Sequence, residues 1–441
     1  MILENVNIYT EEQKFVPGRL VVEGDRIAYL DLKVGMGVGP LKAGFYTDQK
    51  KAEVSGQNID RSEEEILDGK GAYAVPGLID LHFHGCMGAD ICDGTLEALK
   101  QMAAYEVSVG VTAIAPATMT LPVEQLLHIL RTAAQYKQEQ DEKSAARGSA
   151  CIGGEKFSTM RNAACIGVEN HTATDGADLV GINMEGPFIS PRKRGAQEAS
   201  YILSCDTKQA HQFLEASQGL VKFIGIAPEE SQNALDFIRE MKKETNISLA
   251  HTNASYEVAL AAYQAGANHA THLYNAMPAF AHRAPGVIGA VHDCPWVMAE
   301  LICDGVHVHP AVVRATFDML GKDRIILISD SMRATGMPDG MYTLGGQKVC
   351  AQGNRATLVR DGSLAGSVTN LADCLRVTVQ EMGIPLETAI AAATINPAKC
   401  LGIDDTYGSL SPGKKADIIL LGPNLSLIEV IKDGKRLARS Y

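Results

Sequence analysis

The sequence predicts a (β/α)8 barrel of the TIM type, together with a small β-sandwich domain built from both ends of the chain. From Pro76 onward, short apolar runs alternate eight times with helical or long connecting segments. Such alternation predicts a parallel sheet, and eight units predict closure into a barrel. Most of the eight runs end in a polar residue that can bind a metal or a substrate. With 441 residues, the chain is long enough for one large domain and one smaller domain.

The small domain is expected to comprise residues 1–75 and 405–441. Residues 2–9 partly alternate between apolar and polar, and Gly24-Asp25 separates two apolar runs, which is a hairpin signal. In residues 35–65 the strand-like pattern gives way to glycine and charged residues. We therefore expect an insertion or loop there, with 59–67 returning to a strand. Residues 414–421 and 427–431 are apolar runs that predict the C-terminal strands of the same domain.

The barrel is expected over residues 76–404. Its predicted strands lie within 76–85 and at 111–116, 179–185, 221–227, 247–251, 268–272, 297–304 and 324–330. Apolar residues from Val123 to Ala134 recur at helical spacing after the second strand. Residues 138–178 are polar, charged and glycine-rich, which predicts a surface insertion. A hairpin is expected within 336–353, followed by helices at 371–382 and 385–393.

Six predicted metal ligands follow or end these strands. In a strand, residues two apart point to the same face, so the His-x-His pair should present two imidazoles side by side. The six residues are His82, His84, Glu185, His251, His272 and Asp330. Nitrogen and oxygen ligands without a thiolate suit Zn²⁺, Fe²⁺, Mn²⁺ or Co²⁺ in an open catalytic site better than a closed structural zinc site.

Six protein ligands are too many for one four-coordinate ion with a free position. They could serve two ions if one carboxylate bridges them, and Glu185 is the natural bridge. The alternative is a barrel whose rim is polar for no functional reason. That alternative would bury several histidines and carboxylates unpaired, which is costly. His269 lies three residues before His272, hence on the opposite face of the strand, and is expected to be structural.

Charge, hydropathy and cysteine spacing exclude several classes of partner. The formal net charge of −12 repels polyanions, so we expect no nucleic-acid partner. No apolar run is long enough to cross a bilayer, and the first 20 residues lack the apolar core of a signal peptide. Ten cysteines without a Cys-x-x-Cys pair predict reduced thiols and a cytoplasmic location.

Several motifs together resemble a known family. They are Pro-Gly-Leu-Ile-Asp-Leu-His-x-His-Gly at 76–85, Met-Glu-Gly-Pro-Phe at 184–188, His-Thr-Asn-Ala at 251–254, His-Leu-Tyr-Asn-Ala-Met at 272–277, Asp-Gly-Val-His at 304–307, Ser-Asp-Ser-Met at 329–332, Leu-Ala-Gly-Ser at 364–367 and Asn-Pro-Ala-Lys at 396–399. With these motifs the chain resembles the amidohydrolase superfamily, and within it the deacetylases that act on N-acetylglucosamine 6-phosphate.

The resemblance implies roles for the six ligands. Glu185, His251 and His272 resemble the ligands of the main metal. His82, His84 and Asp330, with Glu185 shared, resemble the second site of two-metal members. The implied cofactor is a divalent metal, Zn²⁺ or Fe²⁺, at one or two ions per subunit. Asp330 is implied as the general base and acid.

The resemblance also implies contacts to the substrate. The corresponding residues here are Ala196, Gln197, Asn275, Ala276, Arg283, His307, Leu364, Ala365 and Gly366. Some members have a substrate-contacting histidine where this chain has Gln197, which can donate a hydrogen bond but cannot carry charge. Hydantoinase-like enzymes instead bridge two metals with a modified lysine on the fourth strand. Here that strand ends in Ala227-Pro228-Glu229, without a lysine.

The implied reaction is hydrolysis of the acetamide of N-acetylglucosamine 6-phosphate to glucosamine 6-phosphate and acetate. A metal-activated hydroxide would attack, with Asp330 moving the proton. A deacetylase of another amino-sugar phosphate, of the galactosamine type, or another amidohydrolase is the enzymatic alternative. A non-enzymatic scaffold is the other alternative, and such proteins usually lose metal ligands that are all present here. The family is commonly dimeric, so a homodimer is expected.

Overall fold

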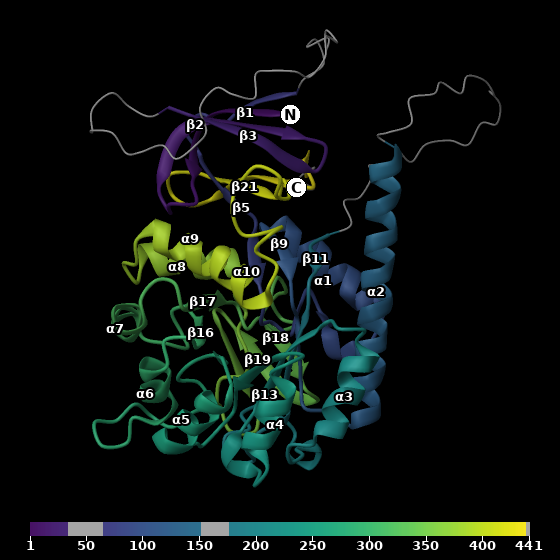
Figure 1. Ribbon diagram of the computed structural model, residues 1–441, viewed down its shortest axis with the longest axis vertical. Helices are drawn as coiled ribbons and strands as arrows, with labels where there is room; N and C mark the ends of the chain where they lie inside the picture. The colour runs from purple at the N-terminus through teal and green to yellow at the C-terminus, as the bar shows by residue number, and fades with distance from the viewer. Residues whose placement is uncertain (34–64, 151–175, 438–441) are drawn as a thin grey trace, which may run out of the picture. The chain divides into compact units, whose positions relative to one another are not determined.

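The computed structural model describes residues 1–33, 65–150 and 176–437 (Figure 1). The predicted insertion at 35–65 lies almost entirely outside the described residues, as does the greater part of the one at 138–178. The chain divides into two compact units. One comprises Met1–Pro76 with Ser409–Arg436, and the other consists mainly of Gly77–Gly408.

The smaller unit is an eight-stranded sheet built from segments Met1–Pro76 and Ser409–Arg436. Its order is β23 (Lys435–Arg436), β22 (Leu427–Lys432), β21 (Ile418–Leu421), β5 (Tyr73–Pro76), β1 (Ile2–Tyr9), β2 (Phe15–Glu23) and β3 (Arg26–Leu32), with β4 (Ile66–Asp68) paired to β1. The hairpin predicted at Gly24-Asp25 is confirmed, since β2 and β3 pair antiparallel across it. An isolated antiparallel β-bridge joins Arg26, in the edge strand β3, to Lys415. The sheet packs around an apolar core of its own.

The larger unit is the predicted barrel. Its eight strand positions are β6 (Leu78–Asp80), β9 (Val111–Ile114) with β10 (Ala117–Thr118), β11 (Asp178–Leu179) with β12 (Ile182–Phe188), β13 (Val221–Ile226), β14 (Asn246–Leu249), β15 (His269–Ala270), β16 (Met298–Ile302) and β17 (Ile325–Ile328). All neighbours around this ring that form ladders are parallel. The predicted fold class is therefore confirmed.

Several predicted strands need correction, and those predicted at 247–251, 268–272 and 324–330 each end two residues earlier. The third barrel strand is interrupted rather than continuous, and the break comes at Gly181, where a Cβ would lie 2.5 Å from Cγ of Lys222. The first strand ends at Asp80, so His82 and His84 lie in the loop after it. Backbone bonds of this loop close the ring: His82 O accepts from Asp330 N at 3.0 Å, and His84 N donates to Ser331 O at 2.7 Å.

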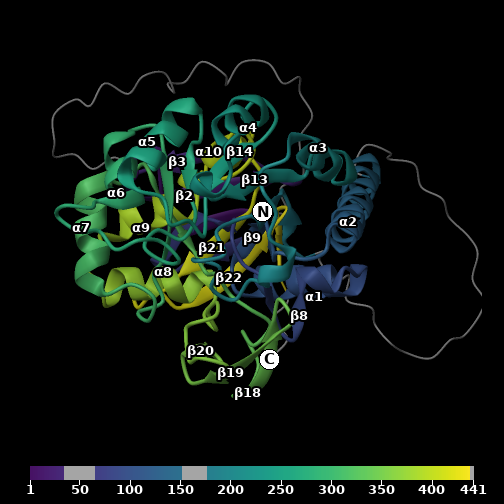
Figure 2. The ribbon, with the colours of Figure 1, turned by 90° about the horizontal axis from the view of Figure 1, so that it is seen from below.

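Helices surround the barrel strands in the view of Figure 2. They are α1 (Leu96–Ser108), α2 (Val123–Ala150), α3 (Thr207–Ala216), α4 (Ala234–Met241), α5 (Tyr256–Ala265), α6 (Gly286–Asp293), α7 (Pro310–Leu320), α8 (Leu371–Gln380), α9 (Leu386–Ala393) and α10 (Ile395–Leu401), with short 3₁₀ turns at Ile91–Asp93, Ala199–Tyr201 and Pro228–Glu230. Of the helices within the described ranges, none is sufficiently long and apolar to cross a membrane.

Helix α2 extends further than predicted. The prediction assigned residues 138–178 to a surface insertion because they are polar, but 138–150 continue the helix. Lys137 pairs with Asp141 at 2.8 Å, and Gln138 donates to Glu142 at 2.9 Å. Such i,i+4 pairs stabilise a solvated helix that has no apolar stripe.

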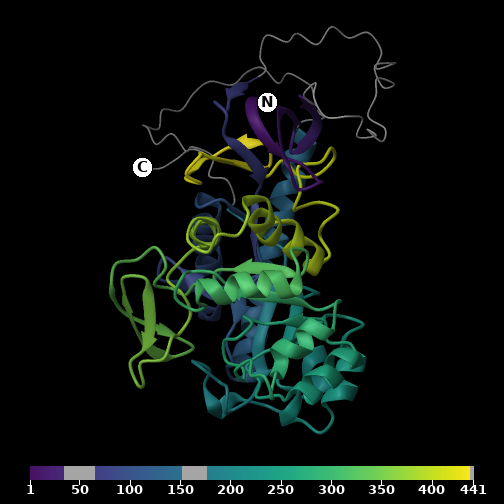
Figure 3. The same cartoon turned by 90° about the vertical axis from the view of Figure 1, so that its left-hand side faces the viewer.

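A three-stranded antiparallel sheet stands beside the barrel (yellow-green, Figure 3). Its strands are β18 (Gly340–Leu344), β19 (Gln347–Gln352) and β20 (Arg355–Leu358), while β7 (Gly85–Cys86) and β8 (Ala89–Asp90) form a separate two-residue pair. The predicted hairpin is confirmed and has a third strand. Arg360 donates to Gly195 O at 2.8 Å, which fastens this sheet to the loop after β12.

Candidate active site

The strands of the barrel position the predicted ligands at equivalent places. His82, His251, His272 and Asp330 each lie two residues beyond the end of a strand. Three of them adopt left-handed backbone angles: φ is +45° at His251, +28° at His272 and +48° at Asp330. A non-glycine residue in this region carries strain of roughly 1–3 kcal/mol, and such residues cluster at functional sites.

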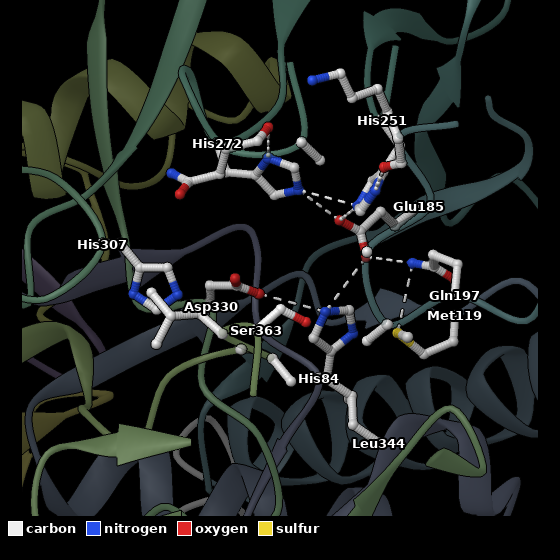
Figure 4. A pocket seen from close by; sticks show the side chains of 18 of the residues that line it. His84, Met119, Glu185, Gln197, His251, His272, His307, Asp330, Leu344 and Ser363 are labelled. Carbon is white, nitrogen blue, oxygen red and sulfur yellow. Dashed lines mark hydrogen bonds and ion pairs between the residues drawn. The ribbon is translucent and has the colours of Figure 1, made fainter. Parts of the chain in front are cut away.

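Glu185, within β12, meets two of these histidines. Its Oε1 atom lies 2.8 Å from Nε2 of His251 and 2.7 Å from Nε2 of His272 (Figure 4). The two Nε2 atoms lie 3.2 Å apart. All three side chains are buried. The three atoms expected to bind the main metal therefore converge on one point.

The other predicted ligands face the same carboxylate. Nε2 of His84 lies 3.4 Å from Glu185 Oε2 and 3.3 Å from Asp330 Oδ1 (Figure 4). Nε2 of His82 lies 3.6 Å from Glu185 Oε1 and 3.8 Å from Asp330 Oδ1. Glu185 thus stands between the two groups, where a bridging carboxylate would have to be.

Backbone carbonyls identify the protonated nitrogen of three histidines. Nδ1 of His84 lies 2.9 Å from Ala117 O, Nδ1 of His251 lies 2.8 Å from Lys193 O, and Nδ1 of His272 lies 3.1 Å from Asn275 O. A carbonyl oxygen only accepts hydrogen bonds, so each Nδ1 carries the hydrogen. In the neutral ring, Nε2 is then the unprotonated nitrogen that can bind a metal.

The residues fit a divalent cation. Without a cation, acceptor nitrogens and carboxylate oxygens would face one another at short distances unless extra protons separate them. Within the described residues, the buried His82 Nε2 and Asp330 Oδ1 atoms have no hydrogen-bond partner. Of the ligand groups of suitable spacing among the described residues, two lie at this site, His82–Glu185–His272 and His82–His84–Asp330. Nitrogen and oxygen ligands of this kind suit Zn²⁺ or Fe²⁺.

The electrostatic field at the centre favours positive charge. Burial by itself lowers the pKa of His82, but the carboxylates of Glu300, Glu185 and Asp330 outweigh it and raise that pKa to about 10. Burial raises the pKa of Glu185, but His251 and the other histidines hold it well below its usual value. The same balance lowers the pKa of Asp330, so its carboxylate is ionised near neutral pH.

Glu300 is a residue that the sequence reasoning missed. It lies in the middle of β16 and is fully buried. Its Oε2 atom lies 2.8 Å from Nδ1 of His82 and accepts the backbone N–H of His272 at 2.9 Å. The available signal was a charged residue inside an apolar strand, because a buried charge needs partners.

A cavity of about 320 Å³ opens beside the metal ligands. It lies at the lower end of the range for small-molecule sites, roughly 300–1,000 Å³. The predicted substrate residues that line it are Ala196, Gln197, Asn275, Ala276, His307, Leu364, Ala365 and Gly366. His84, Glu185, His251, His272 and Asp330 form its metal-binding wall.

Arg283 does not line this cavity. It is exposed, and its Nη1 atom lies 2.7 Å from Nε2 of the neighbouring His282. The cationic residues that do line the cavity are Arg192 and Lys193, to which the sequence reasoning gave no role. Lys193 donates to Met277 O at 2.9 Å. A basic run near the Glu-Gly-Pro loop was the only signal for them.

Gln197 contacts Glu185 directly. Its Nε2 atom donates to Glu185 Oε2 at 2.8 Å, and its Oε1 atom accepts from Thr120 N at 2.5 Å. Gly195, with φ of +56°, allows the loop to approach His251, since a Cβ there would lie 3.2 Å from the His251 ring. The loop after β12 therefore supports two ligands as well as the cavity wall.

Two further histidines have clear partners. Nδ1 of His307 lies 2.7 Å from Asp304 Oδ2, so the carboxylate fixes the ring at the cavity wall. His269 is buried, with Nδ1 3.0 Å from Ser248 Oγ. Burial lowers the pKa of His269 to about 4, so it is neutral at pH 7. This agrees with the structural role predicted for it.

Comparisons with known proteins show which proteins the chain resembles. Residues 155–437 match the model of the amidohydrolase family. The chain is 35% identical over 395 residues to the N-acetylglucosamine-6-phosphate deacetylase of Bacillus subtilis (strain 168), covering 88% of this chain and 91% of that protein. It is 32% identical over 361 residues to the N-acetylgalactosamine-6-phosphate deacetylase of Escherichia coli O157:H7, covering 82% of this chain and 86% of that protein.

A solved structure is similar over nearly the whole chain. The crystal structure of N-acetyl-D-glucosamine-6-phosphate deacetylase from Mycobacterium smegmatis superposes with a TM-score of 0.79 at 27% sequence identity. The superposition covers 99% of this chain and 100% of that chain.

Proposed function

Because the chain belongs to the amidohydrolase family, we propose that it hydrolyses the acetamide of N-acetylglucosamine 6-phosphate to glucosamine 6-phosphate and acetate. The relatives that bear this activity in their names match over most of their length. The proposal rests above all on one observation: both oxygens of Glu185 face histidine nitrogens at the wall of a cavity that Asp330 also lines.

The residues that would hold the metal are those described above. Glu185, His251 and His272 form the main position, and His82, His84 and Asp330, with Glu185 shared, form the second. We propose Zn²⁺ or Fe²⁺, at one or two ions per subunit. A bound divalent ion supplies a Lewis acid that lowers the pKa of water toward about 7 and polarises a carbonyl.

Asp330 is proposed as the group that moves the proton. Its carboxylate can take a proton from the attacking water because it is ionised, since His84 and His82 hold its pKa below the usual value. It can then deliver that proton to the departing amine, which is too basic to leave as an anion. Its position at the cavity wall gives access to both groups.

The sugar and its phosphate would occupy the remaining cavity. His307, with Nδ1 toward Asp304, can accept a hydrogen bond from a sugar hydroxyl through Nε2. Arg192 and Lys193 supply the positive charge that a phosphate needs, and a guanidinium can bind two phosphate oxygens at once. A phosphate contact by Arg283 stays a prediction. Arg283 is exposed and does not line this cavity.

The galactosamine epimer is the second candidate substrate, since one relative is named for it. The two sugars differ in the orientation of a single hydroxyl. Acetate release should be measured on both sugar phosphates and on N-acetylglucosamine without phosphate. We expect the highest kcat/KM on N-acetylglucosamine 6-phosphate, and a large loss without the phosphate. Greater kcat/KM on the galactosamine epimer would reassign the substrate.

We also propose a cytoplasmic homodimer. All eight cysteines of the described segments are free thiols, as expected in a reducing compartment. The homodimer is proposed from the family resemblance alone. Sedimentation of the purified protein tests it, because a monomer at assay concentration would exclude a dimer as the working form.

A further inference from the structure

Glu300 contacts one predicted ligand of each of the two proposed metal positions. Its side chain points into the barrel from β16 and is inaccessible to solvent. The Oε2 atom receives two donors: the imidazole Nδ1–H of His82 at 2.8 Å and the backbone N–H of His272 at 2.9 Å. The Oε1 atom accepts from Nδ2 of Asn183 at 3.3 Å.

This arrangement determines how His82 can act. The ring of His82 is fully buried, and among the residues that the structure describes its one hydrogen-bond partner is Glu300, through Nδ1. A carboxylate accepts, so Nδ1 carries the hydrogen, and in the neutral ring that binds a metal Nε2 is the unprotonated nitrogen, facing Glu185 and Asp330. A carboxylate behind a histidine fixes the tautomer and ring orientation, and makes the other nitrogen a better metal ligand.

The other three histidine ligands are held differently. Their Nδ1 atoms meet backbone carbonyls, which no side-chain substitution removes. His82 alone among the four depends on a side chain. Glu300 also holds the backbone of His272, a ligand of the main position, through the same oxygen atom.

We propose that Glu300 is the positioning residue that makes His82 competent to bind the second metal ion and fixes its distance from the main position. This inference rests on the metal-dependent function proposed above. Loss of the carboxylate frees the His82 ring to adopt the other tautomer or to rotate. The second ion should therefore bind more weakly, by about 10–100-fold as for other such partners of ligands. The main ion should be affected less, since Glu300 reaches its ligand only through the backbone.

The test compares Glu300→Gln and Glu300→Ala with the wild-type protein. The glutamine has the same shape but no charge and one acceptor oxygen instead of two. Ser248→Ala is the control, because it removes buried hydrogen bonds to His269 and Thr271 from β14, two strands away from β16, while Ser248 itself makes no hydrogen bond to Glu300. Each metal-free protein is titrated with Co²⁺, which is followed by visible absorption, and bound metal is counted after dialysis.

We expect the wild type and Ser248→Ala to bind two ions, and both Glu300 variants to keep one and bind the second about 10–100-fold more weakly. Wild-type affinity for two ions, with an unchanged Co²⁺ spectrum in a folded Glu300 variant, would overturn the proposal. A wild type that binds no metal and releases no acetate would instead refute the proposed function.

If neither Glu300 variant folds, the proposal is tested on the wild-type protein by NMR. The carboxylate should give the His82 Nδ1–H proton a strongly downfield NMR signal that is absent in His82→Gln. A spectrum without such a signal would overturn the proposal.

Discussion

Oδ1 of Asp330 lies 3.3 Å from Nε2 of His84 at the wall of the cavity. In Asp330→Asn the amide keeps the shape of the side chain but cannot take a proton. Turnover should fall by roughly 10²–10⁴-fold, which is the usual contribution of general acid–base catalysis. Acetate release gives kcat, and circular dichroism with metal analysis should show that the fold and the main ion persist. Near-normal turnover in this variant would remove Asp330 from the mechanism.

Arg192 and Arg283 offer a paired test of phosphate binding. Both are exposed, but Arg192 lines the cavity and Arg283 does not. Arg192→Ala should raise KM by roughly 10–100-fold, since hydrogen bonds to charged groups contribute about 1.5–3 kcal/mol. The control Arg283→Ala should change KM little in the same assay. The opposite pattern would place the phosphate beyond the cavity described here.

Variants of Gln197 can show whether this residue positions Glu185 or contacts the substrate. In Gln197→Ala, Glu185 loses the donor at 2.8 Å and Thr120 N loses its acceptor. We expect kcat and metal retention to fall by roughly 10–100-fold with KM nearly unchanged. Gln197→His should recover much of the loss, because a ring nitrogen can donate to Glu185. A variant that changes only KM would show that Gln197 binds the substrate and does not orient Glu185.

His269 should make the metal-free protein sensitive to acid. Its folded-state pKa is about 4, below the usual value near 6.5 of the unfolded chain. Between these values the unfolded state binds the extra proton, so stability falls as the pH falls. The loss from pH 7 to pH 5 amounts to about 2 kcal/mol. Urea unfolding at both pH values should show a smaller loss in His269→Gln. Equal losses in the two proteins would mean that His269 is not buried in a neutral form.

Much of the barrel followed from the alternation of apolar runs and helical segments. The exact ends of its strands could not be predicted, because they depend on local hydrogen bonds between side chains and backbone. Asp80 accepts from the backbone of His82 at 3.2 Å, which turns the chain out of the strand before the His-x-His pair. The length of helix α2 was underestimated because its apolar periodicity stops before residue 138, and the rest of the helix is polar.

The proposed metal ligands could be picked out in the sequence because they follow or end strands, where a parallel barrel brings distant residues together. Glu300 was not visible, since its partners His82 and His272 are distant in sequence and it lies within a strand. Arg192 and Lys193 were hidden for another reason. A surface run of basic residues looks the same whether or not it faces a cavity.

The proposed function requires that deacetylation by this protein depends on bound metal. The most direct measurement follows acetate release from N-acetylglucosamine 6-phosphate by one protein preparation, before chelation, after chelation and after addition of Zn²⁺ or Fe²⁺, with bound metal counted each time. We predict that activity disappears with the metal and returns with one or two ions per subunit. Full acetate release by metal-free protein, or none by the reloaded protein, would contradict the account.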